Sequence, residues 1–364
     1  MRSSYGIVRR ETSTLSSDGH SWLRVLVWFP DSTYTRRGVV QLVHGMSEHI
    51  GRYDQFARFL ASLGYVVFGH DHIGHGKSVS SSHELGCMPL EDGKEVLIQD
   101  VLHVRKVVLT DGDTGIKSTD ANLPYFLFGH SMGSYIVRVI AARNFGDLST
   151  LAGVVLCGTG NQPHWLAAAG NFICRAISAI KGQDHRSALL YSLVSGSFSS
   201  AIDNPRTEFD WLSTDPRVVD AYCNDPLSGT RFSAGAYAAL TGMVAEAVSK
   251  TSAASVPKDL PMLFISGEED PVGSMGKGVD KAVDGYQRQG VRDIKEILYP
   301  GMRHEILNEP DKMTVFSDVE SWLTQQVILH SIQKEKTQQD TEGQKKSVSM
   351  TEREHYSEKN PLTF

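Results

Sequence analysis

The sequence has few cysteines, no long apolar run and no excess of positive charge, and each absence excludes a class of protein. Its cysteines have no paired metal-ligand spacing and are too few to cross-link a chain of 364 residues; they are Cys87, Cys157, Cys174 and Cys223. No apolar stretch approaches the roughly 18 residues that a membrane-spanning helix needs. With 36 basic residues against 42 acidic ones the formal net charge is -6, which gives no support to a nucleic-acid partner.

The composition also bears on the size of the core and on the compartment. At 40% hydrophobic and 21% charged residues, the chain is globular and can form one large core or two modest ones. Scattered cysteines are typical of reduced thiols in a cytosolic protein. The basic residues near the start are not followed by the apolar run of a signal peptide. We therefore expect a cytoplasmic protein without a secretion or anchoring segment.

Short apolar segments that alternate with longer stretches of helical spacing predict the fold class. The apolar segments have the length of buried strands; they are SWLRVLVWF, GVVQLVHG, GYVVFGHD, LPYFLFGHS, AGVVLCG, PMLFISGEED and IKEILYPG. Helical spacing occurs between them, for example in YDQFARFLASLG, DVLHVRKVVL, SYIVRVIAARN and AYAALTGMVAEAV. This alternation predicts an α/β fold with a mostly parallel sheet and helices on both faces. Active sites of such folds lie at the carboxyl ends of the strands.

The alternation stops in one internal segment and again near the end of the chain. Between residues 161 and 232 the strand runs give way to apolar residues such as Trp165 and Phe172, which indicates an inserted helical cap. From Ser331 the sequence is poor in aliphatic residues and dense in charge, so it cannot offset its ordering entropy. The predicted organisation is core 1–160, cap 161–232, core 233–330 and a disordered tail 331–364.

The strongest chemical signal is the sequence GHSMG at residues 129–133, which matches the pattern G-x-S-x-G. It follows the apolar run 123–128 and precedes the helical run 135–144. A nucleophile elbow needs a strand that turns sharply into a helix, with small residues on both sides of the serine. Because the pattern lies in this context, we predict that Ser131 is the nucleophile of a serine hydrolase.

A serine nucleophile needs a histidine base and a carboxylate that fixes the tautomer of that histidine. In a site of this type the chain order is serine, acid, histidine. After the predicted strand 261–266 come the candidate acids Glu268, Glu269 and Asp270. We favour Asp270, because the loop must carry the acid beyond the strand tip and the following Pro-Val pair fixes its exit. The two glutamates are then expected in a solvated turn.

The base is predicted from its position after the last strand. His304 follows the predicted strand 294–298 and opens a final helix. It is the only histidine between Asp270 and His330. We therefore predict that His304 is the general base.

An oxyanion hole needs two backbone N–H groups that point at the developing negative charge. One should belong to Met132, the residue after the nucleophile. The second should come from the loop after an early strand, where the sequence is HGMSEH at 44–49. Gly45 lets the backbone approach the ligand closely, so we propose the amide of Met46 as the second donor.

A cluster of histidines at 70–75 suggests a zinc site that its spacing does not support. His70, His72 and His75 lie close together in GHDHIGHG. Zinc hydrolases of the H-x-H-x-D-H type have an aspartate before the last histidine, and Gly74 occupies that place here. A hydrogen-bonded loop beside the active site is the better interpretation. We expect no metal.

At this point the motifs resemble the monoacylglycerol lipase and lysophospholipase branch of the α/β-hydrolases, which is often classed with the serine aminopeptidases. The resemblance spans about residues 20 to 325. It rests on HGMSEHIGRYD at 44–54, DHIGHGKS at 71–78, GHSMGS at 129–134, DWLSTDPRVVDAYCNDPLSG at 210–229, GEEDPVG at 267–273 and MRHEILNE at 302–309. It implies the α/β-hydrolase fold and the hydrolysis of a single acyl ester of the monoacylglycerol or lysophospholipid kind through an acyl-enzyme, without a cofactor.

The resemblance also assigns roles and shows two departures. Glu48 and Arg52 match positions that help to bind the leaving alcohol in this family, while a surface ion pair is the alternative. Ser134 stands where glycine is usual. Leu307 stands where the animal monoacylglycerol lipases have a second histidine near the glycerol. These departures leave the selectivity for glycerol open.

Three other functions compete with this one. A carboxylesterase for small esters has the same triad. An aminopeptidase needs acidic cap residues for the substrate ammonium, such as Asp203, Glu208 and Asp210, but Met132 stands where proline iminopeptidases have tryptophan. A non-catalytic binding protein usually lacks a triad member, and none is missing here. The apolar cap can form an acyl tunnel and, as a hypothesis, touch membranes transiently.

Overall fold

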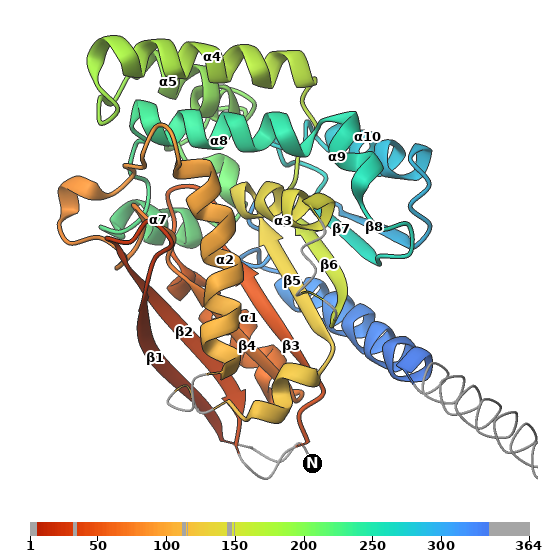
Figure 1. Cartoon of the computed structure of the whole chain (residues 1–364). Helices are drawn as coiled ribbons and strands as arrows, with labels where there is room; N and C mark the ends of the chain where they lie inside the picture. The colour runs from red at the N-terminus through yellow and green to blue at the C-terminus, as the bar shows by residue number, and fades with distance from the viewer. Residues whose placement is uncertain are drawn as a thin grey trace, which may run out of the picture.

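The computed structural model describes residues 6–31, 35–110, 114, 116–143, 148 and 150–334. In this part of the chain an eight-stranded sheet has the order β1-β2-β4-β3-β5-β6-β7-β8 (Figure 1). Its strands are β1 (Ile7–Leu15), β2 (Trp22–Pro30), β3 (Gly38–Val43), β4 (Tyr65–His70), β5 (Tyr125–His130), β6 (Leu151–Cys157), β7 (Met262–Gly267) and β8 (Ile294–Tyr299). The pairs from β4 to β8 are parallel, whereas β2 is antiparallel to both of its neighbours.

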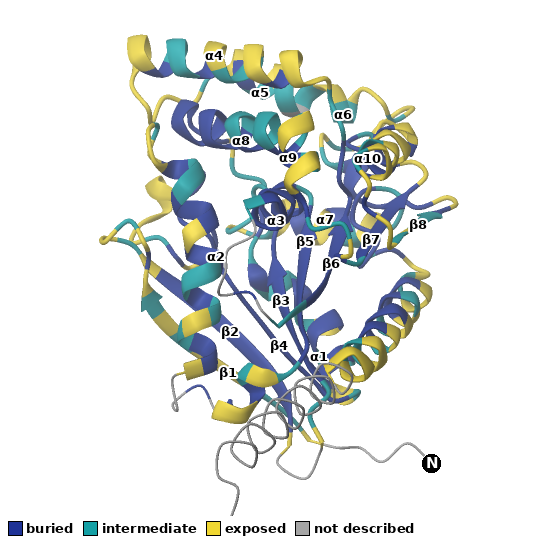
Figure 2. Ribbon diagram, turned by 45° about the vertical axis from the view of Figure 1, so that its right-hand side comes forward, coloured by how far each residue is buried: buried dark blue, intermediate teal, exposed yellow. Residues whose placement is uncertain are grey.

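Alternate residues of the strands face two separate halves of the core. In β2, Val25 and Val27 belong to one buried cluster, and Leu26 and Trp28 belong to the other. Side chains of a strand alternate between the two faces of a sheet, so each face is apolar and needs a layer of helices over it. Figure 2 shows the buried strands between helices whose outer sides are exposed.

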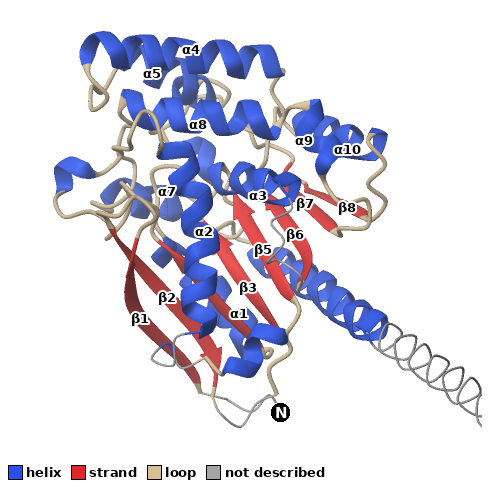
Figure 3. Cartoon of the chain, in the orientation of Figure 1, coloured by secondary structure: helices blue, strands red, loops and turns tan. Residues whose placement is uncertain are grey.

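Helices on both faces complete this core and confirm the predicted α/β fold with a mostly parallel sheet (Figure 3). One face is covered by α2 (Gly93–Thr110), α3 (Met132–Arg143) and α10 (Lys277–Arg288). The other face is covered by α1 (Asp54–Ser62) and by the helix of residues 312–334. In the second helix Phe316, Val319 and Leu323 are buried at intervals of one helical turn.

The segment between β6 and β7 is helical and lies over the carboxyl ends of the strands. It contains α4 (His164–Lys181), α5 (Ala188–Tyr191), the π-helical turn η5 (Ser192–Gly196), α6 (Ser197–Ser199), η6 (Asp210–Leu212), α7 (Pro216–Asn224), α8 (Ala234–Ala247) and α9 (Lys250–Ser255). Helix α8 lies between α4 and the core helices α2 and α3 (Figure 1). The predicted cap boundary at residue 232 falls just before α8.

Two features of the chain ends differ from the sequence predictions. Strand β1 was not predicted, because Arg9, Arg10 and Glu11 interrupt its apolar residues; as an edge strand it contains only half-buried and exposed residues. Residues 331–334, which were assigned to a disordered tail, continue the last helix. The rest of that predicted tail, 335–364, lies outside the described residues. Among the described helices, none has the length and hydropathy that crossing a bilayer requires.

Candidate active site

Ser131 occupies a tight turn between β5 and α3. Its φ angle is 52°, a left-handed conformation that side-chain-bearing residues rarely adopt. The flanking glycines make this turn possible, since an added Cβ would lie 2.4 Å from the Gly133 carbonyl oxygen at Gly129 and 2.0 Å from the Val43 carbonyl oxygen at Gly133. The hydroxyl of buried Ser134 donates to the Ser131 carbonyl at 2.6 Å. The turn therefore has the shape of a nucleophile elbow.

Asp270 and His304 form a buried pair beside this turn. His304 Nδ1 lies 2.8 Å from Asp270 Oδ2, and both residues are almost completely buried. Asp270 also accepts hydrogen bonds from the Val272 amide at 2.8 Å and from the Ser266 hydroxyl at 3.1 Å, so its orientation is fixed. The alternative acids Glu268 and Glu269 are exposed. The geometry therefore distinguishes Asp270 from its two neighbours.

The loop that carries His304 is anchored to the η6 segment. The His304 amide donates to the Trp211 carbonyl at 3.4 Å, and the Glu305 amide donates to the Leu212 carbonyl at 2.7 Å. Two aromatic rings lie near the imidazole, whose centroid is 5.0 Å from that of Trp211 and 4.7 Å from that of His130. Neither residue was predicted from the sequence to belong to the site.

The loop after β3 passes directly over the nucleophile. An added Cβ at Gly45 would lie 3.0 Å from Ser131 Cβ and 2.7 Å from Glu48 Oε1, so only glycine fits there. Met46, the next residue, lines the same cavity as Ser131 and Met132. Met132 is the first residue of α3, and its amide is one of the N–H groups that lack a partner within the helix. Met46 and Met132 therefore both line the cavity that contains Ser131.

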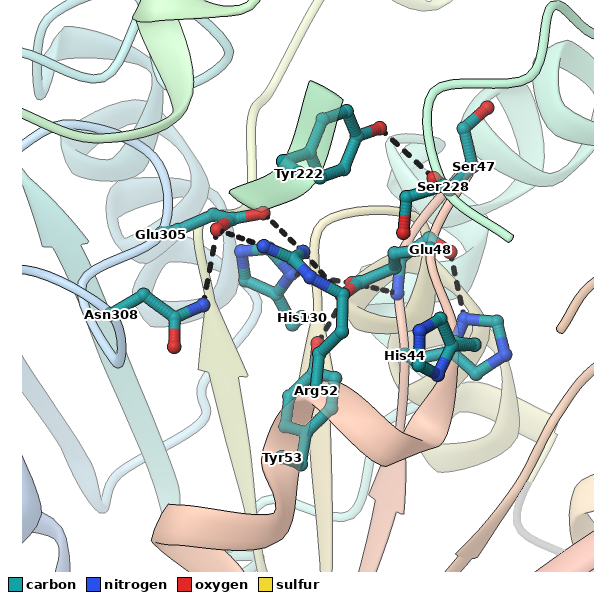
Figure 4. A network of polar contacts seen from close by, with 12 residues as sticks. His44, Ser47, Glu48, Arg52, Tyr53, His130, Tyr222, Ser228, Glu305 and Asn308 are labelled. Carbon is teal, nitrogen blue, oxygen red and sulfur yellow. Dashed lines mark hydrogen bonds and ion pairs between the residues drawn. The ribbon is translucent and has the colours of Figure 1, made fainter. Parts of the chain in front are cut away.

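Glu48 and Arg52 belong to a network of buried charges (Figure 4). Glu48 accepts hydrogen bonds from the Gly45 amide at 2.6 Å and from the Tyr53 hydroxyl at 2.8 Å, and it pairs with Arg52 at 3.1 Å. Both Nη atoms of Arg52 contact the Glu305 carboxylate, at 2.5 and 2.6 Å. The alternative of a surface ion pair is wrong, since all three charged side chains are largely buried.

The charges of this network stabilise one another. Burial alone raises the pKa of the Glu48 carboxyl, but His130 and Arg52 outweigh this effect and hold that pKa well below its ordinary value. Burial lowers the pKa of His130, yet the Glu48 carboxylate 3.1 Å from its Nδ1 raises the pKa overall. Arg52 lines a recess of about 10 Å³ behind Glu48, whereas Glu48 and Glu305 reach the wall of the main cavity.

The main cavity has a volume of about 420 Å³ and connects the serine with the helices above it. Its wall combines the predicted site residues Ser131, His304, Met46 and Glu48 with mostly apolar side chains of α4 and α8. The residues from these helices are Leu166, Ala167, Ala169, Gly170, Ile173, Tyr237, Leu240, Thr241 and Val244. An apolar space of this size beside a few polar groups can hold a flexible hydrocarbon chain.

The histidines that suggested zinc form a buried cluster under this site. His44 and His72 have ring centroids 4.1 Å apart, and His70 and His72 have centroids 4.9 Å apart. Among the described residues, no group of three or more His, Cys, Asp or Glu side chains is placed to hold a metal ion. His75 Nδ1 lies 2.9 Å from the Ile73 carbonyl, and the His72 amide donates to His44 Nε2 at 3.0 Å. The hydrogen bonds are those of a packed loop.

Known proteins are similar to this chain over most of its length. The family described as serine aminopeptidase, S33 (Hydrolase_4) matches residues 34–311. A monoacylglycerol lipase of Mycolicibacterium smegmatis is 31% identical over 304 residues, which are 82% of this chain and 91% of the relative. The human monoglyceride lipase is 28% identical over 313 residues, which are 85% of this chain and 89% of the relative.

Solved structures agree with these relatives. A carboxyl esterase from Bacillus coagulans in complex with glycerol has a TM-score of 0.79 and 29% identity, and the match covers 88% of this chain and 99% of that chain. A soluble variant of the monoglyceride lipase from Saccharomyces cerevisiae in complex with a substrate analog has a TM-score of 0.67 and 21% identity, with 88% and 96% covered. The second structure supports the fold alone.

The buried histidines predict a loss of stability in mild acid. Burial lowers the pKa of His70 to about 3, and neither of its ring nitrogens has a hydrogen-bond partner among the residues that the structure describes. Below pH about 6.5 the unfolded chain binds a proton at this histidine that the folded chain excludes, so stability present above that pH is lost as the pH falls. His70→Phe should recover about 2 kcal/mol of the unfolding free energy lost between pH 7 and pH 5.

Urea unfolding at both pH values measures this difference. The exposed His20→Gln serves as the control and should keep the acid sensitivity of the parent. If His70→Phe loses as much stability between pH 7 and pH 5 as the parent does, His70 is not the source of the effect.

Proposed function

Since the chain belongs to the serine aminopeptidase S33 (Hydrolase_4) family, we propose that it hydrolyses monoacylglycerols with Ser131 as the nucleophile. The comparisons confirm two predictions from the sequence, namely an α/β-hydrolase of the monoacylglycerol lipase type and a serine ester hydrolase. The observation that carries the proposal for the site is the buried Asp270–His304 pair beside Ser131 at one end of an apolar cavity.

In the proposed mechanism each triad residue has its own role in the transfer of the acyl group. Asp270 accepts a hydrogen bond from the Nδ1–H group of His304, which leaves the unprotonated Nε2 to take the proton of the Ser131 hydroxyl. The serine oxygen bonds to the ester carbonyl carbon, and the C–O bond to the alcohol breaks as His304 returns the proton to the leaving oxygen. Water then hydrolyses the acyl-enzyme by the same steps, giving a free fatty acid.

Met46 and Met132 are the proposed oxyanion donors. The tetrahedral intermediate places a negative charge on the former carbonyl oxygen, and two fixed N–H groups stabilise it more in the transition state than in the ground state. Met132 is also the first residue of α3, where the helix dipole favours a negative charge. One such donor is worth about a hundredfold to a thousandfold in kcat.

The acyl chain and the alcohol are assigned to different parts of the cavity. We place the acyl chain against the apolar residues of α4 and α8 and the alcohol near Glu48, which faces the cavity. Arg52 is not part of the described cavity wall, but it pairs with Glu48 and Glu305, which are. Its proposed role in alcohol binding is therefore to hold these carboxylates in place. The Bacillus coagulans esterase, which was solved in complex with glycerol, is consistent with an alcohol of this kind.

The competing functions find less support in the described residues. An aminopeptidase needs a free carboxylate for the substrate ammonium, but Asp203, Glu208 and Asp210 are absent from the described cavity wall. Glu208 bonds the Tyr191 hydroxyl, and Asp210 accepts from the Arg206 amide. The wall carboxylates Glu48 and Glu305 are already paired with Arg52. A lysophospholipid or a small ester remains an outcome of the substrate test below.

Contact with a membrane surface belongs to the same proposal. Helix α4 carries large apolar side chains on its outer side, where Trp165 is 70% exposed, Phe172 74% and Ile180 78%. Leu189 and Leu193 are exposed on the neighbouring segment. Apolar patches of this kind on a soluble fold mark sites of contact with lipid or protein. We infer a cytoplasmic enzyme that touches lipid surfaces transiently through α4.

The first experiment compares substrates with and without the nucleophile. Hydrolysis should be fastest on medium or long monoacylglycerols, slower on the matching lysophosphatidylcholines and p-nitrophenyl esters, and at least about a thousandfold slower in Ser131→Ala and Asp270→Asn. The exposed Ser200→Ala is the control and should keep full activity. Turnover of short p-nitrophenyl esters alone would indicate a general carboxylesterase, and activity in Ser131→Ala would mean that another residue is the nucleophile.

A second prediction concerns the length of the acyl chain. Gly170 of α4 lines the cavity, so Gly170→Leu adds a side chain where the acyl chain should lie. We expect kcat/KM to fall about tenfold or more on C16 monoacylglycerol and to change little on C4 esters, since each displaced methylene loses about 0.8 kcal/mol of burial. Ala168→Leu is the matched control, because Ala168 is exposed on the same helix. Equal loss on both substrates would place the acyl chain elsewhere.

A third prediction concerns the exposed face of α4. Replacing Trp165, Phe172 and Ile180 together by serine should weaken sedimentation with phosphatidylcholine vesicles at least tenfold, since each side chain contributes about 1.5 kcal/mol or more when buried in lipid. Turnover of p-nitrophenyl acetate in solution should be unchanged. The control is Ile328→Ser with Ile332→Ser, two exposed residues of the last helix. Undiminished vesicle binding of the α4 variant would exclude this surface.

A further inference from the structure

Ser47, which follows the proposed oxyanion donor Met46, has an unusual backbone conformation. Its φ angle is 56°, in the left-handed region that residues with a Cβ rarely adopt. A residue with this φ angle persists only where its surroundings hold it there. The φ angle of Ser47 sets the direction in which the chain continues back to Met46, so the groups that hold Ser47 also position the Met46 amide.

The groups that hold Ser47 come from residues 222–230, which are the last turn of α7 and the loop that follows it. The Ser47 carbonyl accepts a hydrogen bond from the Tyr222 hydroxyl at 2.9 Å (Figure 4). It also accepts one from the Gly229 amide at 2.9 Å. The Ser47 hydroxyl donates to the Thr230 carbonyl at 2.6 Å. We call residues 44–49, which follow β3 and include Met46, the oxyanion loop. All three bonds connect this loop to the 222–230 segment, which lies within the predicted cap.

A fourth contact fixes the other end of the same loop. His49 Nε2 lies 2.8 Å from Asp225 Oδ2, and Asp225 also accepts from the Ser228 hydroxyl at 2.7 Å. Between these contacts Glu48 is held from the core side, by Tyr53 and by Arg52. The loop is therefore held by the core at Glu48 and by the 222–230 segment at Ser47 and His49.

We propose that the 222–230 segment is part of the oxyanion hole's support: it keeps Ser47 in the left-handed conformation and thereby aims the Met46 amide at the reacting oxygen. Tyr222 and Ser47 are positioning residues in this scheme, which rests on the proposed function. Tyr222, Gly229 and Thr230 also line the cavity. A substrate in the cavity therefore touches the segment that sets the oxyanion donor, and the cap affects kcat as well as substrate binding.

The test uses p-nitrophenyl acetate, whose two-carbon acyl group does not need the apolar cavity. Tyr222→Phe keeps the ring 4.8 Å from the Arg52 guanidinium and 5.0 Å from Phe209 but removes the bond to Ser47. We expect kcat to fall about tenfold, a fraction of the loss of a whole donor, with KM within about twofold. Cys223→Ser, an exposed neighbour on α7, is the control and should leave kcat unchanged.

A matched pair at residue 47 tests the backbone conformation itself. Ser47→Ala and Ser47→Gly both remove the hydroxyl, but only glycine adopts a positive φ without steric cost. We expect Ser47→Gly to keep several-fold more kcat than Ser47→Ala, and to recover part of the loss when it is combined with Tyr222→Phe. If Ser47 served folding alone, kcat would not be higher in Ser47→Gly than in Ser47→Ala when each variant is assayed equally far below its melting temperature.

The rate of phosphonylation by a fluorophosphonate probe gives the same comparison without ester turnover, since the phosphoryl oxygen occupies the oxyanion hole. If kcat and the labelling rate are unchanged in Tyr222→Phe, or if Ser47→Ala and Ser47→Gly are equally impaired, the inference fails although the enzyme is a Ser131-dependent esterase. If ester turnover or labelling persists in Ser131→Ala, the proposed function fails instead.

Discussion

Glu48 places a carboxylate almost completely out of water, and the active site is arranged around the partners that this charge requires. Those partners come from three parts of the chain: the Gly45 amide in the oxyanion loop, Arg52 and Tyr53 just before α1, and His130 at the end of β5. Losing one partner of a buried ion pair destabilises a protein by about 3–5 kcal/mol, so separating these loops would cost a large part of the folding free energy. The positions of the nucleophile turn and the oxyanion loop therefore depend on one buried charge.

Much of the fold, and candidates for the triad, could be predicted from the sequence because the signals are local. Buried parallel strands are continuous apolar runs, and the segments predicted for β2 to β8 coincide with those strands within a few residues. The elbow at Ser131 is equally local, since it needs only a strand, two glycines and a helix. Asp270 and His304 followed from chain order, because parallel strands bring their carboxyl ends to one edge of the sheet. Edge strand β1 has no such signal, since none of its residues is fully buried.

The polar partners of these residues could not be predicted, since they depend on which loops meet in space. Glu305 is 253 residues away from Arg52 along the chain, and no spacing rule connects them. The bonds from Tyr222 and Thr230 to Ser47 are of the same kind. Only the family resemblance pointed to Glu48 and Arg52. It implied contact with the alcohol but did not predict the buried network. The residue type of Ser47 does not reveal its positive φ angle. Only its position next to the proposed donor Met46 could have pointed to it.

The pairing of opposite charges explains how ionised groups can be buried beside His304, the proposed general base. Both ring nitrogens of His130 face acceptors, with Nδ1 3.1 Å from the Glu48 carboxylate and Nε2 3.3 Å from the His304 carbonyl. Burial lowers the pKa of His130, but the Glu48 carboxylate outweighs burial and raises that pKa overall. Arg52 contacts the carboxylates of both Glu48 and Glu305. These contacts between opposite charges fix the loops of Ser131 and His304.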